Sequence, residues 1–239
     1  MVWSDFLDNL KNCAIIVAAG KGKRMGGDIS KQYLEIGGIP ILTRTLWNFQ
    51  NCDIIDEMVL VTGKDDIEFC KKEIIEKYNV KKIKAIIKGG AERQNSVYNG
   101  LCALDSDTDI VLIHDGVRPF LKGEYIEKII YETQKYESCV LGVKVKDTIK
   151  VCDENGIVSE TPERNGLWIA QTPQSFKYDL IMEAHKKAID DNFLGTDDSM
   201  LVERIGKKVK MTEGDYDNIK ITTVEDLYFG DAIIKKVTK

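Results

Sequence analysis

The sequence is poor in histidine and proline, and its cysteines are not arranged in close pairs. It contains two histidines, four prolines and six cysteines among 239 residues. No two cysteines have the Cys-x-x-Cys spacing of zinc and redox motifs, so the sequence argues against a zinc site and against a disulfide scaffold. No apolar run approaches the roughly 20 residues that a membrane-spanning helix requires, and no secretory leader is recognisable. These absences predict a cytoplasmic protein with reduced thiols and no membrane partner.

An excess of positive charge is also missing. The chain has 34 Lys and Arg against 39 Asp and Glu, which gives a net charge of −5. This balance argues against a general affinity for nucleic acid or anionic membranes. With 43% hydrophobic residues the chain can bury a sizeable core, and its length fits one α/β domain that spans residues 1–239.

Short apolar runs alternate with helical patterns along the first 145 residues. Runs rich in Val and Ile are typical of fully buried strands, and between them apolar residues recur every three or four positions. This alternation predicts a mainly parallel, Rossmann-like α/β sheet with helices on both faces. The predicted strands are residues 13–19, 58–62, 83–88, 109–115 and 139–145, and the helical patterns cover residues 67–78, 97–104 and 126–133.

The pattern changes at about residue 146. Residues 146–172 contain short β-like runs around Asn155-Gly156, a pair that favours a two-residue hairpin turn, so we expect an arm that projects from the sheet. Apolar spacing also favours a docked helix at the N-terminus, through Trp3, Phe6 and Leu10. Further elements are expected at 180–188 (helix), 207–214 (strand) and 223–237 (helix, with Thr223 and Asp226 as a capping box).

A glycine-rich, basic segment follows the first predicted strand. Its backbone N–H groups could approach an anion closely, and its cations could neutralise a polyphosphate. A solvated glycine turn with surface lysines would have the same composition. The spacing matches neither the P-loop nor the dinucleotide fingerprint, which argues against both classes. The glycines are Gly20, Gly22, Gly26 and Gly27, and the cations are Lys21, Lys23, Arg24 and Lys31.

The run "IVLIHDGVRPF" places a carboxylate and a guanidinium after another strand. Carboxyl ends of parallel strands meet at one edge of a sheet, so Asp115 and Arg118 should lie near the glycine segment. Asp115 could hold Mg²⁺ on a phosphate, and Arg118 could grip a second phosphate through its planar fork. Alternatively, the two residues form a simple ion pair across a turn. His114 is interpreted as a packing residue, because nothing nearby in the sequence completes a metal or nucleophile set.

Seven motifs, in order over nearly the whole chain, resemble those of the 2-C-methyl-D-erythritol 4-phosphate cytidylyltransferase family. They are "AAGKGKRMGGDISKQYLEIGG", "GGAERQNSVYNGL", "HDGVRPF", "VKDTIK", "RNGLWIAQTPQ", "TDDSMLVE" and "EGDYDNIKITTVEDL". The resemblance implies transfer of CMP from CTP to a polyol phosphate with release of pyrophosphate, a Mg²⁺ cofactor, and a homodimer built by the projecting arm.

The resemblance also implies roles for individual residues. The implied catalytic cations are Arg24, Lys31 and Lys220. The implied nucleotide-binding residues are Ala18, Ala19, Gly20, Gly22, Gly90, Arg93 and Ser96, with Ser96 opening a helix beneath the base. The implied substrate-binding residues are Asp115, which also binds the metal, Arg118, Thr148, Thr172, and Arg164, which the family supplies from the partner subunit.

Two other functions fit parts of the same pattern. Ribitol 5-phosphate cytidylyltransferases look similar over the same length. The pair Gly116-Val117 favours them, because the erythritol enzymes usually have two alanines at these positions. We expect this departure to affect the acceptor pocket, since Gly116 should lie beside the substrate phosphate. A catalytically silent nucleotide-binding scaffold would share the fold. Against it, the sequence retains the full set of cations and the carboxylate: Arg24, Lys31, Asp115, Arg118 and Lys220.

Overall fold

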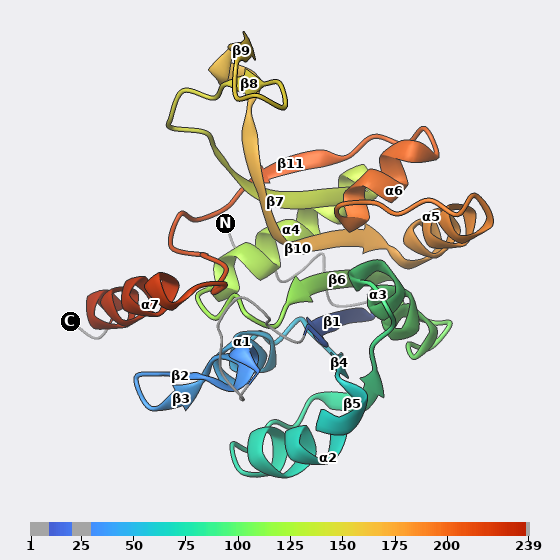
Figure 1. Ribbon diagram of the computed structural model, residues 1–239. Coiled ribbons are helices and arrows are strands. Elements are labelled where there is room, and N and C mark those ends of the chain that lie inside the picture. The colour runs from blue at the N-terminus through green and yellow to red at the C-terminus, as the bar shows by residue number, and fades with distance from the viewer. Residues whose placement is uncertain (1–9, 21–29, 238–239) are drawn as a thin grey trace.

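A seven-stranded sheet forms the centre of the fold (Figure 1). The computed structural model describes residues 10–20 and 30–237. The strand order across the sheet is β11-β7-β10-β6-β1-β4-β5. The strands are β1 (Asn12–Ala18), β4 (Glu57–Thr62), β5 (Ile83–Lys88), β6 (Ile110–Asp115), β7 (Ser138–Lys144), β10 (Trp168–Lys177) and β11 (Lys210–Glu213).

The sequence predicts six of these strands, with small differences at their ends, and the mainly parallel sheet is confirmed. Neighbouring strands are parallel except where β10 lies antiparallel between β6 and β7. Strand β10 was not predicted as a member of the central sheet. Its buried part, residues 171–176, is mostly polar, so it lacks the apolar run that marks a buried strand. Its register shifts between Ala170 and Gln174, around Pro173, which cannot donate to the ladder.

Helices cover both faces of the sheet, as expected. Helices α3, α5 and α6 pack on one face, and α1, α2 and α4 pack on the other. Helix α1 has no counterpart in the sequence prediction. The helices are α1 (Ile41–Gln50), α2 (Ile67–Phe69, continued by a π-helical turn over Cys70–Glu76), α3 (Arg93–Cys102), α4 (Gly123–Tyr136), α5 (Tyr178–Asp190) and α6 (Asp198–Arg204).

Alternate residues of each central strand enter different cores. In β1, Cys13 and Ile15 pack under α3 and α5, whereas Ala14 and Ile16 pack toward α1 and α4. All four side chains are fully buried. A strand covered on both faces needs apolar residues at every position, which is why the sequence shows runs without alternation.

A third, smaller core joins helix α7 (Val224–Val237) to the body. It includes Ile36, Val117 and Ile221, next to the short hairpin of β2 (Glu35–Ile36) and β3 (Ile39–Pro40). The Asp226 carboxylate accepts hydrogen bonds from the backbone N–H groups of Thr222 and Thr223 at 2.7 and 2.8 Å. The predicted capping contact between Asp226 and Thr223 is therefore present, and Thr222 joins it.

The predicted arm projects from the sheet between β7 and β10 (Figure 1). It carries β8 (Val151–Cys152), β9 (Val158–Glu160) and a 3₁₀ turn at Arg164–Gly166. The two-residue turn at Asn155-Gly156 is a wrong prediction, because only Gly156 has a positive φ, of 78°. Instead the Asp153 carboxylate accepts from the backbone N–H groups of Asn155 and Ile157, both at 2.9 Å, and closes a longer loop.

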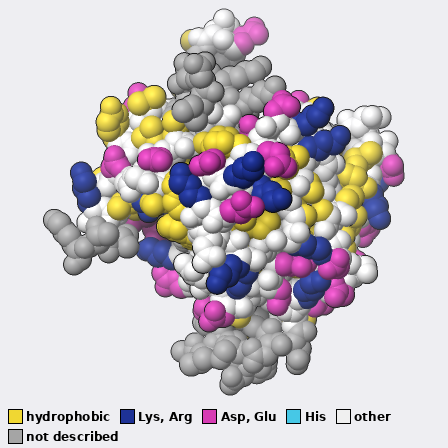
Figure 2. Space-filling view, turned by 90° about the horizontal axis from the view of Figure 1, so that it is seen from below, with side chains coloured by type: hydrophobic (Ala, Val, Ile, Leu, Met, Phe, Trp, Pro, Cys, Tyr) yellow, Lys and Arg dark blue, Asp and Glu magenta, His cyan; other side chains and the backbone are white. Residues whose placement is uncertain are grey.

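The surface carries charges of both signs. On the face seen in Figure 2, Lys and Arg side chains are interspersed with Asp and Glu, and no histidine is visible. His114 and His185 are both fully buried. None of the helices formed by residues 10–20 and 30–237 is long and apolar enough to cross a membrane. The helix expected from Trp3 and Phe6 lies outside the described residues.

Candidate active site

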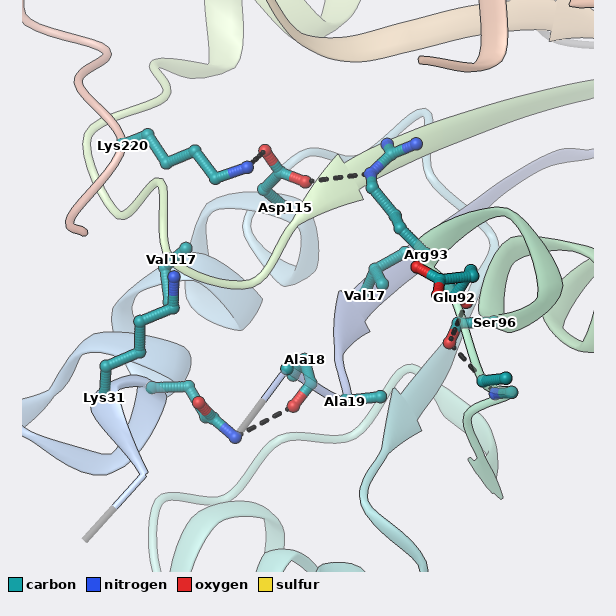
Figure 3. A pocket seen from close by; sticks show the side chains of 14 residues that line it. Val17, Ala18, Ala19, Lys31, Glu92, Arg93, Ser96, Asp115, Val117 and Lys220 are labelled. Atoms are coloured by element: carbon teal, nitrogen blue, oxygen red, sulfur yellow. Dashed lines mark hydrogen bonds and ion pairs between the residues drawn. The ribbon is translucent and has the colours of Figure 1, made fainter. Parts of the chain in front are cut away.

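A cavity of about 320 Å³ lies at the carboxyl ends of β1 and β6 (Figure 3). These strands are neighbours, and Val17 of β1 pairs with Asp115 of β6. From β1 the chain continues to β4 on one side of the sheet and later returns to β6 on the other side. The gap between the ends of β1 and β6 is therefore a topological switch point, the place where open α/β sheets bind ligands. The cavity is lined by Val17, Ala18, Ala19, Gly20, Lys31, Gln32, Gly90, Ala91, Glu92, Arg93, Ser96, Asp115, Val117 and Lys220.

A glycine turn brings the loop after β5 against the end of β1. A Cβ atom on Gly89 would lie 2.4 Å from the Cβ of Ala19, so only glycine permits this approach. The Ser96 hydroxyl accepts from the backbone N–H of Gly90 at 3.0 Å and fixes the turn. Ser96 does not open the helix as expected: α3 begins at Arg93, and Glu92 and Asn95 form its capping box.

Lys31 lies in a short 3₁₀ turn, Lys31–Tyr33, on the opposite wall of the cavity. The neighbouring Gln32 is 2% exposed, and its amide donates to the carbonyl of Ala18 at 2.9 Å. This bond ties the turn to the end of β1 (Figure 3). Gln32 therefore helps to place Lys31, a role that no local pattern in the sequence indicates.

Asp115 lies at the centre of a cluster of cations. Its carboxylate is 2.9 Å from the Lys220 ammonium, 3.4 Å from Nε of Arg93 and 3.5 Å from Nε of Arg118. Burial alone would raise the pKa of Asp115, but the charges of Arg93, Lys220 and Arg118 outweigh it and hold that pKa well below its usual range. The carboxylate is therefore ionised at neutral pH.

Arg93 joins this cluster to a second buried carboxylate. Its Nη1 lies 2.7 Å from Oδ2 of Asp198, whose side chain is 1% exposed. Burial opposes ionisation of Asp198, but the charge of Arg93 outweighs it and lowers the pKa. The neighbouring residues Asp197 and Asp198 have different partners: Asp197 caps α6 by accepting from the N–H of Met200 at 2.9 Å, whereas Asp198 pairs with Arg93.

A second cavity, of about 160 Å³, adjoins the first. Arg93, Asp115 and Lys220 line both cavities, so this trio forms their common boundary. The remaining lining residues of the second cavity are Arg118, Ala170, Gln171, Thr172, Gln174, Thr196 and Asp197. Arg118 and Thr172, both implied to bind the acceptor, thus lie together there.

Asn218 fastens the loop that carries Lys220. It is 1% exposed, and its side-chain amide donates to the carbonyl of Thr172 at 2.9 Å. The backbone carbonyl of Asn218 accepts from Nη1 of Arg118 at 2.8 Å. The loop is therefore anchored to β10 and to the segment after β6. Sequence reasoning missed Asn218; its place two residues before Lys220, within the same motif, is the only signal that could have indicated it.

The structure does not place four of the implied site residues in either cavity, for two different reasons. Gly22 and Arg24 fall outside the described residues. Thr148 and Arg164 are exposed on the arm and line neither cavity of this chain. Arg164 donates to the carbonyl of Lys146 at 2.6 Å.

Gly116 directly follows β6, and its predicted effect on the acceptor pocket stays a prediction. Gly116 does not line the second cavity, and a Cβ atom there would lie 3.0 Å from the Cβ of Ala18 and 3.1 Å from Leu42. Val117 lines the first cavity instead. Gly116 thus packs beneath the end of β1, because its N–H donates to the carbonyl of Val17 at 2.9 Å.

The residues fit a Mg²⁺ ion only as part of a larger ligand set. Within residues 10–20 and 30–237, no group of three or more His, Cys, Asp or Glu side chains could hold a metal by itself. Asp115 offers one ionised carboxylate at the cavity, and Mg²⁺ commonly takes one or two carboxylates with phosphate oxygens and water. Asp115 could therefore hold a Mg²⁺ ion here if a bound phosphate ligand supplied the other oxygens.

Comparisons with known proteins give a consistent result. The family model for 2-C-methyl-D-erythritol 4-phosphate cytidylyltransferase matches residues 12–236. A protein of this name from Clostridium botulinum (strain Okra) is 51% identical over 228 residues, covering 95% of this chain and 99% of the relative. One from Caldanaerobacter subterraneus is 48% identical and covers 93% and 98%.

Solved structures resemble the chain over the same length. The crystal structure of 4-diphosphocytidyl-2C-methyl-D-erythritol synthase from Anaerococcus prevotii has a TM-score of 0.86 and 39% identity, and covers 97% of this chain and 99% of that one. The cytidylyltransferase of Thermus thermophilus has a TM-score of 0.75 and 27% identity, and covers 95% and 100%.

Proposed function

The chain belongs to the 2-C-methyl-D-erythritol 4-phosphate cytidylyltransferase family of nucleotidyltransferases, and we propose that it transfers CMP from CTP to 2-C-methyl-D-erythritol 4-phosphate, releasing pyrophosphate. The observation that carries this proposal is the pair of adjoining cavities with Arg93, Asp115 and Lys220 at their boundary. Two anionic substrates held on either side of this trio would meet at its cations. The relatives named for the methylerythritol acceptor favour this substrate over ribitol 5-phosphate.

The larger cavity is the proposed CTP site. Cytosine carries an amine donor and carbonyl and ring-nitrogen acceptors. The backbone N–H groups of Gly89 and Gly90 already donate to Thr62 and Ser96, so the carbonyl oxygens of this turn are the groups proposed to accept from the amine. The triphosphate would then extend along Ala19 and Gly20 toward Lys31. Arg24, which follows Gly20 closely in the sequence, is proposed as a further phosphate cation.

The proposed reaction is an in-line displacement at the α-phosphorus. A phosphate oxygen of the acceptor forms the new P–O bond, and the bond from the α-phosphorus to the bridging oxygen of pyrophosphate breaks. Lys220 and Lys31 stabilise the charge that develops on the equatorial and leaving oxygens, the dominant contribution in phosphoryl transfer. An acceptor phosphate is already ionised at neutral pH, so the step needs neither a protein nucleophile nor a general base.

Asp115 is the proposed magnesium ligand. A bound Mg²⁺ would add positive charge beside the triphosphate. Lys220 contacts Oδ2 of this carboxylate at 2.9 Å, and its side chain is 39% exposed. Lys220 can therefore leave Asp115 for a phosphate oxygen when the substrates bind.

The arm is the proposed dimer contact. It exposes five large apolar side chains, at Ile149, Val151, Ile157, Val158 and Ile169, which a second copy of the chain could cover. Arg164 and Thr148 lie on the same arm and away from the cavities of their own chain. A twofold dimer would allow Arg164 to complete the acceptor site of the partner.

Mixing two inactive variants tests this shared site. In a 1:1 mixture of Arg164→Ala and Lys220→Ala chains, half of the dimers are mixed and each holds one intact site, so about a quarter of the wild-type activity should return. Sedimentation equilibrium would verify the dimer. Activity that stays at the level of the separate variants would contradict the contribution of Arg164 across the dimer.

The acceptor is tested by measuring pyrophosphate release with CTP and Mg²⁺. The protein should turn over 2-C-methyl-D-erythritol 4-phosphate far faster than D-ribitol 5-phosphate offered in parallel. The reverse preference would replace the proposed acceptor while leaving the nucleotide site intact. Release with neither acceptor would favour a silent nucleotide-binding scaffold.

A further inference from the structure

His114 lies directly behind the acceptor cavity, and its imidazole is fully buried. It precedes Asp115 in β6, and its ring packs against Phe49 with 5.0 Å between ring centroids. Both ring nitrogens have hydrogen-bond partners: Nε2 lies 3.1 Å from the carbonyl oxygen of Arg118, and Nδ1 lies 3.1 Å from Oγ1 of Thr172. Arg118 and Thr172 are the residues proposed to hold the acceptor, so His114 is more than the packing residue that the sequence indicated.

The chemistry of these partners fixes every proton in the network. A carbonyl oxygen only accepts, so Nε2 of His114 must carry the hydrogen and donate to Arg118. The ring is fully buried, and its two hydrogen-bond partners, the Arg118 carbonyl and the Thr172 hydroxyl, carry no negative charge. Burying a charge without a counter-ion is costly, so the ring is neutral and Nδ1 is an acceptor. The Thr172 hydroxyl must therefore donate to Nδ1. The same hydroxyl oxygen accepts from the backbone N–H of Asp115 at 3.0 Å.

We propose that His114 is a positioning residue of the acceptor site: it holds the Arg118 segment through Nε2–H, and through Nδ1 it fixes the Thr172 hydroxyl as an acceptor toward the substrate. The Thr172 hydroxyl donates its hydrogen to Nδ1 of His114, and one lone pair of its oxygen accepts from the backbone N–H of Asp115. Only the other lone pair remains for a ligand in the cavity.

This arrangement has a consequence for specificity, which rests on the proposed function. An ionised phosphate presents only acceptor oxygens, so Thr172 cannot bind it while the network holds. A hydroxyl group can donate to Thr172. Thr172 therefore recognises a hydroxyl of the polyol, and the cations at Arg118 and Lys220 take the phosphate.

Nitrogen NMR tests the network without any substrate. The chain has only two histidines, so ¹⁵N labelling of histidine and comparison with a His185→Gln variant would assign both rings. We expect His114 to be the neutral Nε2–H tautomer between pH 6 and 8. An Nδ1–H tautomer or a protonated ring in this range would overturn the proposal, whether or not the protein has the proposed activity.

Kinetics of three His114 variants test the positioning role. His114→Phe preserves the packing against Phe49 but removes both bonds, and kcat/KM for the acceptor should fall about 5- to 30-fold while KM for CTP changes less than about twofold. His114→Asn retains an acceptor near Nδ1 and His114→Gln retains a donor near Nε2, so each should restore part of the loss. Unchanged acceptor kcat/KM in all folded variants would overturn the proposal.

Two comparisons separate positioning from a general loss of stability. Thr133 is fully buried and its hydroxyl bonds Ser175 at 2.9 Å in the interface of α4 and β10, so Thr133→Val removes a buried hydrogen bond of similar kind without affecting acceptor KM. If His114 acts through Thr172, the effects of His114→Phe and Thr172→Val should overlap. The double variant should then lose about fivefold less acceptor kcat/KM than the two single fold-losses multiplied together. Multiplicative effects would overturn the link to Thr172.

Discussion

Arg93 is predicted to be the most costly single residue to remove from the site, because it neutralises two buried carboxylates. Its guanidinium lies 2.7 Å from Asp198 and 3.4 Å from Asp115. Asp115 would keep Lys220 and Arg118, but among the described residues the ion-pair partners of Asp198 are Arg93 and His185, whose Nε2 lies 3.6 Å away. The variant Arg93→Met therefore leaves Asp198 as a buried carboxylate without its cation.

The expected cost follows from the burial of the pair. Removing one partner of a buried ion pair typically lowers the free energy of unfolding by about 3–5 kcal/mol. Asp198 is 1% exposed and Arg93 is 29% exposed, so solvent can relieve little of this cost. Replacing Asp198 by Asn in the same chain removes the charge. The double variant Arg93→Met, Asp198→Asn should therefore be more stable than Arg93→Met alone.

The loss of unfolding free energy in Arg93→Met should also depend on pH, and the pKa of Asp198 determines the direction of that dependence. In the wild type the pKa of Asp198 is lowered, so its contribution is present above the ordinary Asp pKa of about 3.9 and is lost as pH falls through the folded value. Without Arg93, burial raises this pKa, so the folded variant takes up a proton that the unfolded chain does not. The difference in unfolding free energy between wild type and Arg93→Met should then shrink from pH 7 to pH 5.

Urea denaturation at both pH values provides the assay. Wild type, Arg93→Met, Asp198→Asn and the double variant would be compared, and the m-values would show whether the unfolding transitions are equivalent. An equal deficit at pH 5 and pH 7, or a double variant no more stable than Arg93→Met, would refute the assignment of the cost to the unpaired carboxylate.

Three further predictions concern activity. Lys220→Ala should fold with an unchanged unfolding midpoint and lose on the order of 10²-fold in kcat, measured by pyrophosphate release; wild-type turnover would contradict its role. Gly89→Ala should raise KM for CTP about tenfold, because its Cβ would lie 2.4 Å from that of Ala19, whereas Gly123→Ala, with no atom within 4 Å, serves as the matched control. Asn218→Ala should lower kcat about fivefold by loosening the Lys220 loop, and an unchanged kcat would show that the bond to the Thr172 carbonyl is dispensable.

Local patterns were sufficient for most of the framework. Strands such as β1 and β6 are buried on both faces, so their sequences are continuous apolar runs that can be recognised without any partner. The polar strand β10 and helix α1 escaped prediction. In β10 the buried polar side chains are satisfied by distant residues: the side-chain amide oxygen Oε1 of Gln174, for example, accepts from the backbone N–H groups of Asp198 and Ser199.

The sequence by itself determined the fold class, the family resemblance and the chemical type of the site, because apolar periodicity, glycines and clustered charges are properties of short segments. Only the tertiary structure decided how these segments act together. It placed Arg93 between Asp115 and Asp198, anchored the Lys220 loop, and brought the ring nitrogens of His114 against Arg118 and Thr172. These contacts join residues up to about 100 positions apart, and a contact between distant segments leaves no periodicity in either one.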